Sequence, residues 1–153
     1  MNNKKIFFRF AVKEDLEDVF NWRNDEITRK YSFNSSELNL DEHKTWYFSS
    51  LKNPNRNIFI ALDEHNAKIG QIRFDRQDNF AIISIVIAPQ FRGQGYGTLT
   101  IINSCEFYFN NLDVDFLVAK IKSENKASIN VFEKAGFEFF SDNDGQLEYR
   151  LKK

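Results

Sequence analysis

The chain has 153 residues, of which 42% are apolar and 16% are aromatic, enough to build the core of a single domain over residues 1–153. The 21 basic and 22 acidic residues leave a net charge of −1, so the domain as a whole has no basic field and no nucleic-acid partner is expected. No run approaches the ~18 apolar residues of a membrane span, and the first residues lack a signal-peptide pattern. We therefore expect a cytoplasmic protein without a membrane partner.

The first half of the chain is predicted to hold, in order, an edge strand at 6–12, a helix from 13 to about 23, a polar segment at 24–40 that fits a short helix at 26–31, a helix at 41–51 and strands at 58–62 and 68–75. Acidic residues in the first turn favour the first helix, and Asp41 is the expected N-cap of the later one. The two strands flank a polar turn, which predicts an antiparallel hairpin.

The second half is predicted to continue with a strand at 82–88, a long helix ending near Leu112, a strand at 114–121, a helix at 125–135 and a hairpin of strands at 137–140 and 147–151. The long helix repeats apolar side chains at helical spacing, at Thr98, Ile101, Ile102, Cys105, Phe109 and Leu112. Because this helix connects two apolar strands, we expect those strands to be parallel neighbours. Cys105 on the apolar face is expected to be a buried thiol.

The junction at Pro89–Gly97 is typical of an anion site. Pro89 ends an apolar strand, and Arg92-Gly93-Gln94-Gly95-Tyr96-Gly97 then opens the long helix. Glycines let a ligand approach the backbone, and the first N–H groups of a helix have no internal partner. This turn is therefore interpreted as a pyrophosphate cradle.

Two other phosphate motifs fit the junction poorly. A P-loop needs Gly-Lys-Ser/Thr, which is absent from the sequence and so excluded. A dinucleotide fingerprint is met by Gly93 and Gly95, but Thr98 occupies the place of the third glycine. Asp115 lies at the distance of the ribose-binding acid but at the start of its strand, so a redox dinucleotide enzyme remains a minor alternative.

The third pattern, Arg/Gln-x-x-Gly-x-Gly/Ala, is met by Arg92, Gly95 and Gly97, and resembles the coenzyme A signature of the GNAT superfamily of N-acetyltransferases. A second segment, Asn125 to Phe137, resembles that family's C-terminal signature and lies about thirty residues later, with one strand between. The resemblance implies an α/β (α+β) GNAT fold in the order βααβββαβαββ, with a mixed, mostly antiparallel sheet of about seven strands and about four helices.

The resemblance also implies acetyl coenzyme A (acetyl-CoA) as the acyl donor and a primary amine as the acceptor, with no metal. The residues expected to bind the coenzyme are Ile85, Val86, Ile87, Arg92, Gly93, Gln94, Gly95, Tyr96, Gly97, Thr98, Asn125, Ser128, Asn130, Phe132 and Lys134. The amine would attack the thioester directly, and a backbone N–H near Ile87 would stabilise the oxyanion. The alternative is that Asn125 is only an N-cap and Phe132 only a core residue, and either structural role is compatible with cofactor contact.

Two positions depart from the family pattern. Phe132 stands where many relatives have a tyrosine that protonates the leaving thiolate, and Ile82 stands where many have a glutamate on the central strand. Solvent or one of Tyr96, Tyr108 and Tyr149 is left for the first role. The second role remains unassigned by the resemblance.

The candidate bases are Glu42 and His43, neighbours on the helix at 41–51. An imidazole has the pKa range of a general base, although a histidine beside two acids also fits a solvated surface group. Asp75 and Ser84 are weaker candidates, and His65, in a turn, is expected to have no role.

The acceptor is expected to be a small-molecule amine. Segments around Trp22-Arg23, Trp46 and Arg73 resemble GNAT enzymes that acetylate nucleotide-linked 4-amino sugars, so these four residues are the expected substrate contacts. An indole could stack on a base or sugar and an arginine could pair with a diphosphate; alternatively, the tryptophans anchor the core and the arginines are surface charges. Acetylation of a protein N-terminus or an antibiotic amine, and a non-catalytic acyl-CoA sensor, stay open, as does the choice between monomer and homodimer.

Overall fold

The computed structural model describes residues 4–153; residues 1–3 of the expected domain lie outside the described part. The strands are β1 (Phe7–Phe10), β2 (Arg56–Leu62), β3 (Lys68–Arg76), β4 (Phe80–Ile87), β5 (Phe116–Lys122), β6 (Glu138–Asn143) and β7 (Gln146–Lys152). The helices are α1 (Leu16–Asn24), α2 (Glu26–Tyr31), α3 (Leu40–Lys52), α4 (Tyr96–Asn111) and α5 (Lys126–Lys134), with 3-10 turns at Lys13–Asp15 and Pro89–Phe91.

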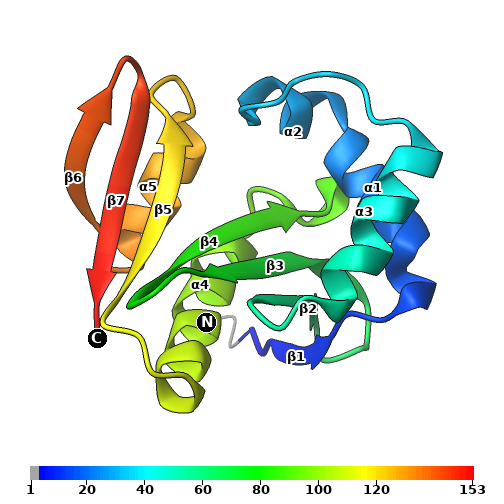
Figure 1. Cartoon of the computed structure of the whole chain (residues 1–153), viewed down its shortest axis with the longest axis horizontal. Coiled ribbons are helices and arrows are strands. Elements are labelled where there is room, and N and C mark those ends of the chain that lie inside the picture. The colour runs from blue at the N-terminus through cyan, green and yellow to red at the C-terminus, as the bar shows by residue number, and fades with distance from the viewer. Residues whose placement is uncertain (1–3) are drawn as a thin grey trace.

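The strands form one mixed sheet in the order β1-β2-β3-β4-β5-β7-β6 (Figure 1). Every neighbouring pair is antiparallel except β4 and β5, which are parallel. The predicted fold class is therefore confirmed, as are the edge position of the first strand and the parallel pair joined by the long helix. The short helix considered at 26–31 is present as α2, which raises the α-helices of the described chain to five.

The parallel pair is short. Only Phe80–Ile82 of β4 pair with Phe116–Val118 of β5, and the strands diverge beyond that point (Figure 1). The remainder of β4, up to Ile87, stays paired with β3 on its other side. The sheet is thus split along the second half of β4, directly before the glycine-rich turn.

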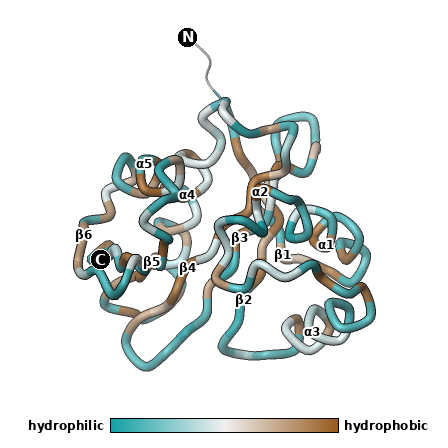
Figure 2. The backbone as a smooth tube through the Cα atoms, turned by 90° about the horizontal axis from the view of Figure 1, so that it is seen from above, coloured by the Kyte–Doolittle hydropathy of each residue, from teal (hydrophilic) through white to brown (hydrophobic). Residues whose placement is uncertain are grey.

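Two separate apolar clusters cover the two faces of the sheet. The larger joins α4 and α5 to the sheet through buried residues such as Ile101, Phe74 and Phe132. The smaller joins α1 and α3 to the other face through Val19, Trp22, Tyr47, Ile58 and Ile60. Figure 2 shows α4 grouped with α5, and α1 with α3, on opposite sides of the strands.

Two local predictions about helices were wrong. The N-cap of α3 is Asn39, whose side chain accepts hydrogen bonds from the N–H groups of Asp41 and Glu42, so the helix begins at Leu40. On α4 the predicted stripe is correct at Ile101 and Cys105, which are buried, but wrong at Ile102, which is 40% exposed; Thr100, Ser104 and Tyr108 are buried as well. Small polar residues on the core side hid the true face from a hydrophobicity pattern. Cys105 is buried as predicted, and burial raises the pKa of its thiol to about 12.

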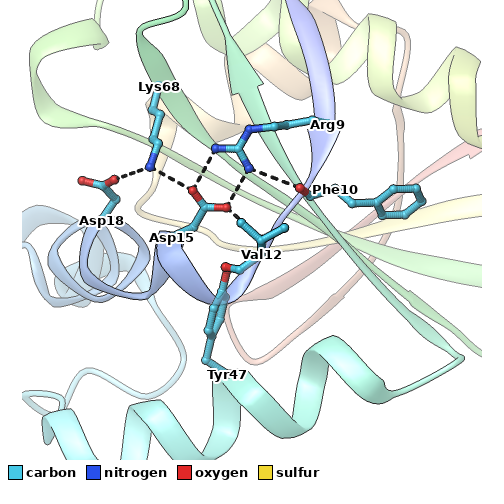
Figure 3. A network of polar contacts seen from close by, with 7 residues as sticks. All are labelled: Arg9, Phe10, Val12, Asp15, Asp18, Tyr47 and Lys68. Atoms are coloured by element: carbon cyan, nitrogen blue, oxygen red, sulfur yellow. Dashed lines mark hydrogen bonds and ion pairs between the residues drawn. The ribbon is translucent and has the colours of Figure 1, made fainter.

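A buried carboxylate fastens the start of α1 to the sheet (Figure 3). Asp15, 1% exposed, accepts hydrogen bonds from Arg9 of β1 at 2.7 and 2.9 Å and from the Val12 N–H, and it pairs with Lys68 of β3 at 2.8 Å. Burial alone would raise the pKa of Asp15, but these donors hold it well below its usual range. Tyr47 of α3 adds a hydrogen bond to the Val12 carbonyl at 2.7 Å, so α1 and α3 share one anchor.

Candidate active site

The turn from Arg92 to Gly97 has the geometry of an anion cradle. Gly93 and Gly95 have φ of 71° and 87°, in the left-handed region, and a Cβ added to either would meet no heavy atom within 4 Å. Gly95 is the N-cap of α4, no side chain caps that end, and the first turn contains no acidic residue. The N–H groups of Tyr96, Gly97 and Thr98 consequently have no acceptor within the helix and lie at its positive end.

The split in the sheet exposes a second set of main-chain groups. At the end of β4, the Ala88 N–H donates to the Ile69 carbonyl of β3. At the other end, just before β4 begins, the Asn79 carbonyl accepts from the Asp115 N–H, just before β5. Because successive N–H groups along a strand point in opposite directions, those of Ile85 and Ile87 point toward the side from which β5 has diverged. The Val86 N–H points to β3 instead, so of the three expected strand contacts two have free amides.

Arg92 does not point its charge into the cradle. Its guanidinium donates to Asp25 Oδ2 and Thr28 Oγ1 of the α2 segment, both at 2.9 Å. At the other side of the split, Lys122 at the end of β5 donates to the Lys30 carbonyl at 3.3 Å. The α2 segment therefore contacts the chain just after β4 and the end of β5, a link that no pattern in the sequence had indicated. Gln94 is also engaged, with the Gln90 carbonyl.

The residues expected from the C-terminal motif divide into three kinds. Asn125 caps α5 by accepting from the Ser128 N–H at 3.2 Å, which confirms the predicted cap. Asn130 and Lys134 are exposed on α5. Phe132 is 3% exposed and packs edge-to-face on Phe137, as a core residue does.

The three tyrosines considered for thiolate protonation lie in different surroundings. Tyr96 opens α4 at the cradle and packs edge-to-face on Phe91. Tyr108 is buried and stacked on Phe74 at 4.2 Å, and Tyr149 donates to Glu133 of α5. Burial raises the pKa of both Tyr108 and Tyr149. Only Tyr96, of these three, stands beside the free amides.

His43 and Glu42 point to different environments. Glu42 is exposed, whereas His43 is 4% exposed and packed among Phe20, Trp46 and Tyr47. The alternative of a solvated surface histidine was wrong. Burial, with the nearby Arg23 cation, lowers the pKa of His43 to about 4, and neither ring nitrogen has a hydrogen-bond partner within residues 4–153.

The four residues expected to contact the acceptor do not all meet. Trp22 is 6% exposed and belongs to the apolar cluster under α1, so it is a core anchor. Arg23, Trp46 and Arg73 do come together: the Arg23 guanidinium lies 4.1 Å from the centre of the Trp46 ring and that of Arg73 lies 5.4 Å from it. The cation over the indole occupies the surface on which a base or sugar was expected to stack.

Two residues that were not expected to contact the acceptor complete this group. Arg56 of β2 lies 5.5 Å from the Trp46 ring centre, and Asp75 of β3 pairs with both Arg56 and Arg73. Asp75 had been considered only as a weak candidate base. Arg73 also approaches the Ser84 hydroxyl of β4 at 3.4 Å, which joins the group to the split strand. We call Arg23, Trp46, Arg56, Arg73 and Asp75 the arginine cluster.

Taken together, a central strand with free amides on one edge, followed by an uncapped glycine-rich helix start, is the arrangement expected of a protein that binds an extended cofactor carrying a pyrophosphate. The family model for the acetyltransferase (GNAT) domain matches residues 5–138, and the chain belongs to this family of acetyl-CoA-dependent acyltransferases. The resemblance seen in the sequence is thus confirmed at the level of the family, of N-acetyl transfer to an amine and of the coenzyme.

The chain is 22% identical over 138 residues to spermidine N(1)-acetyltransferase of Vibrio cholerae, covering 88% of this chain and 80% of the relative. An N-acetyltransferase 9-like protein of Nematostella vectensis is 29% identical over 133 residues, with 77% and 67% covered. The Vibrio cholerae enzyme solved with CoA and spermine superimposes with a TM-score of 0.81 over 95% of this chain and 92% of that one, at 22% identity. The solved structure shares the fold.

Residues 4–153 bring together no group of three or more His, Cys, Asp or Glu side chains that could hold a metal ion. Within the same residues, no helix combines the length and the apolar character needed to cross a membrane.

Proposed function

We propose that this acetyltransferase transfers the acetyl group of acetyl-CoA to the primary amine of a nucleotide-linked amino sugar, in the cytoplasm. The observation that carries the proposal is the arginine cluster on the acceptor side of β4, where three guanidiniums gather around Trp46 and only two of them pair with the one carboxylate, Asp75. Such a surface suits an acceptor that brings negative charge, as a sugar linked to a nucleoside diphosphate does. Spermine, the ligand in the Vibrio cholerae structure, is a polycation and would be repelled.

The coenzyme side supplies the donor geometry. The pyrophosphate would bind the N–H groups of Tyr96, Gly97 and Thr98, and the pantetheine arm would extend along the free edge of β4, toward the amides of Ile85 and Ile87. The Ile87 N–H would then donate to the thioester oxygen as negative charge develops on it. Arg92, which is engaged by Asp25 and Thr28 of the α2 segment, would not contact the pyrophosphate directly.

The acceptor amine must be neutral when it attacks. A free alkylamine has a pKa near 10.4, and His43, whose pKa is lowered to about 4, is too weak a base to take that proton efficiently. The exposed Glu42 lies outside the buried group around His43. We therefore propose that the acceptor amine loses its proton to the bulk buffer before it binds, and that its neutral fraction attacks the thioester. Protonation of the leaving thiolate falls to solvent or to Tyr96.

Distances along β4 fit an acceptor of this size. Ser84, which contacts Arg73, and Ile87, the expected oxyanion donor, are three residues apart on the strand, or about 10 Å. An amine placed at Ile87 and an anionic group placed at the arginine cluster would have a sugar ring and part of the diphosphate between them. This spacing favours an amine and a phosphate at opposite ends of a hexose.

An assay of free thiol release from acetyl-CoA tests the proposal across a panel of amines. The panel holds UDP- and dTDP-linked 4-amino sugars, spermidine, kanamycin and a peptide with a free N-terminus, and each nucleotide sugar is paired with its 4-hydroxy counterpart as the matched control. We expect the aminated nucleotide sugars to have the highest kcat/KM and the hydroxy controls to be inert. Faster turnover of spermidine or of the peptide would refute the acceptor class, and coenzyme binding without turnover of any amine would indicate a sensor.

A further inference from the structure

We infer that the arginine cluster is a binding subsite for a phosphate-type oxyanion carried by the acceptor, and that Arg23 is the residue that contacts this anion. The inference rests on the proposed function, because it concerns the acceptor side of the same site. It goes beyond that function in assigning separate roles to the three arginines.

The three guanidiniums are not equivalent. Arg56 and Arg73 share Asp75, with Arg73 Nε at 3.0 Å from Asp75 Oδ2. Arg23 forms no ion pair and no side-chain hydrogen bond with any residue of the described chain; it lies over the Trp46 ring at 4.1 Å. A guanidinium carries five N–H donors, so Arg23 retains its hydrogen-bonding capacity for a ligand.

The charge balance of the cluster also calls for an anion. Three positive charges face one carboxylate, and the side chains of Arg56, Arg73 and Asp75 are only 25%, 20% and 17% exposed, so water screens them poorly. Burial and the two neighbouring cations lower the pKa of Arg23 to about 10, which agrees with a cation held in unfavourable surroundings. Unneutralised charge of this kind is typical of a ligand site rather than of a structural ion pair.

The cluster is held rigidly enough to recognise a ligand. Its members come from α1, α3, β2 and β3, and Arg56 is further fixed by a hydrogen bond to Ser50 at 2.9 Å. Beside Trp46, His43 is buried with both ring nitrogens unpartnered within residues 4–153, so the same region holds further unused polar capacity. Because cations cover the Trp46 ring, it orients the guanidiniums and does not offer a stacking surface to a base.

The test measures ligand binding without acetyl transfer, by isothermal titration with UDP, inorganic pyrophosphate, malonate and uridine. Arg23→Met keeps most of the side-chain volume and removes the charge, and Arg23→Lys keeps the charge without the planar fork. Arg150→Met is the matched control, because Arg150 also lies over aromatic rings but is paired with Glu148 near the other edge of the sheet. Any nucleotide that binds instead at the coenzyme cradle will be insensitive to Arg23.

We expect UDP and pyrophosphate to bind the unaltered protein, Arg23→Met to weaken both at least tenfold, Arg23→Lys to weaken them less, and Arg150→Met to change neither. Because it relieves repulsion, Arg23→Met should also raise the melting temperature of the unliganded protein, by about 2 °C or more. Malonate binding that depends on Arg23, without pyrophosphate binding, would move the subsite to carboxylates and refute the phosphate assignment. UDP affinity unchanged in Arg23→Met would overturn the inference, whether or not any amine is acetylated.

Discussion

The proposed coenzyme side and the proposed acceptor side of this protein are built from different chemical groups. On the coenzyme side, the second half of β4 and the start of α4 present main-chain N–H groups, and glycines keep the space before them open. On the acceptor side, four elements contribute the side chains that meet at Trp46. Main-chain sites follow from a short local sequence, whereas a side-chain cluster exists only after the whole chain has folded.

The largest effect expected is on the coenzyme side. Gly95→Glu would place a side chain and a negative charge in front of the amides that are expected to bind the pyrophosphate, at a residue with φ of 87°. We predict that acetyl-CoA binding, measured by isothermal titration, weakens at least a hundredfold. Gly145→Glu is the control, because Gly145 has the same φ of 87° in the β6–β7 turn; it should lose stability through backbone strain and keep its coenzyme affinity. Equal affinity losses in the two variants would assign the effect to folding.

The next prediction concerns the acceptor side and pH. The unfolded chain protonates His43 near its ordinary pKa of 6.5, but the folded protein does so only near 4. Stability contributed by the neutral ring is therefore complete above about pH 6.5 and falls as the pH decreases toward 4, by at most about 3 kcal/mol. His43→Leu should flatten this part of the curve in urea unfolding at several pH values. His65→Leu, in an exposed turn, should retain the slope of the unaltered protein; an unaltered slope in His43→Leu would contradict the buried environment.

The next largest effect is expected at Asp75, the single carboxylate of the arginine cluster. Asp75→Asn leaves Arg56 and Arg73 without their shared partner in a poorly hydrated site, and we expect a loss of about 2 kcal/mol in the free energy of unfolding. Glu148→Gln, which breaks the Arg150 pair near the sheet edge, should cost less than about 1 kcal/mol. Added pyrophosphate should restore part of the stability of Asp75→Asn, which a purely structural pair would not allow.

The smallest effect is expected at the contact between the α2 segment and the cradle. Asp25→Asn removes the charged partner of Arg92 and a negative charge near the cradle. Coenzyme affinity should rise by about threefold, the scale of a partly exposed ion pair, while Lys122 still holds α2 at its other contact. Glu26→Gln, an exposed neighbour, should change nothing. A tenfold loss of affinity in Asp25→Asn would show instead that the link to α2 is needed to form the cradle.

How far the sequence predicts the fold can be judged at particular elements. Strands β2, β3 and β5 followed from apolar runs between polar turns, and the parallel pairing of β4 with β5 followed from the helix between them. The buried face of α4 did not follow fully from the sequence, because a hydrophobicity pattern placed Ile102 in the core, whereas Thr100 and Ser104 are buried and Ile102 is exposed. Helix burial depends on what packs opposite, and that information is spread over the sheet.

The candidate site shows the same division. Gly93 and Gly95 could be recognised because glycines between a strand and a helix predict a turn with positive φ, and their spacing resembles a known coenzyme signature. Arg56 could not be recognised, since nothing near it in the sequence indicates that it meets Trp46. For the same reason Trp22 and Trp46 looked alike in the sequence, although one is in the core and the other lies beneath cations.

The most direct test of the coenzyme site is the change in backbone amide resonances when acetyl-CoA is titrated into ¹⁵N-labelled protein. We predict large shifts for Ile85, Ile87 and Gly97, and none for Gly136 and Gly145, which lie in turns away from β4 and the start of α4. Binding that leaves the amides of β4 and of the first turn of α4 unperturbed would contradict the account.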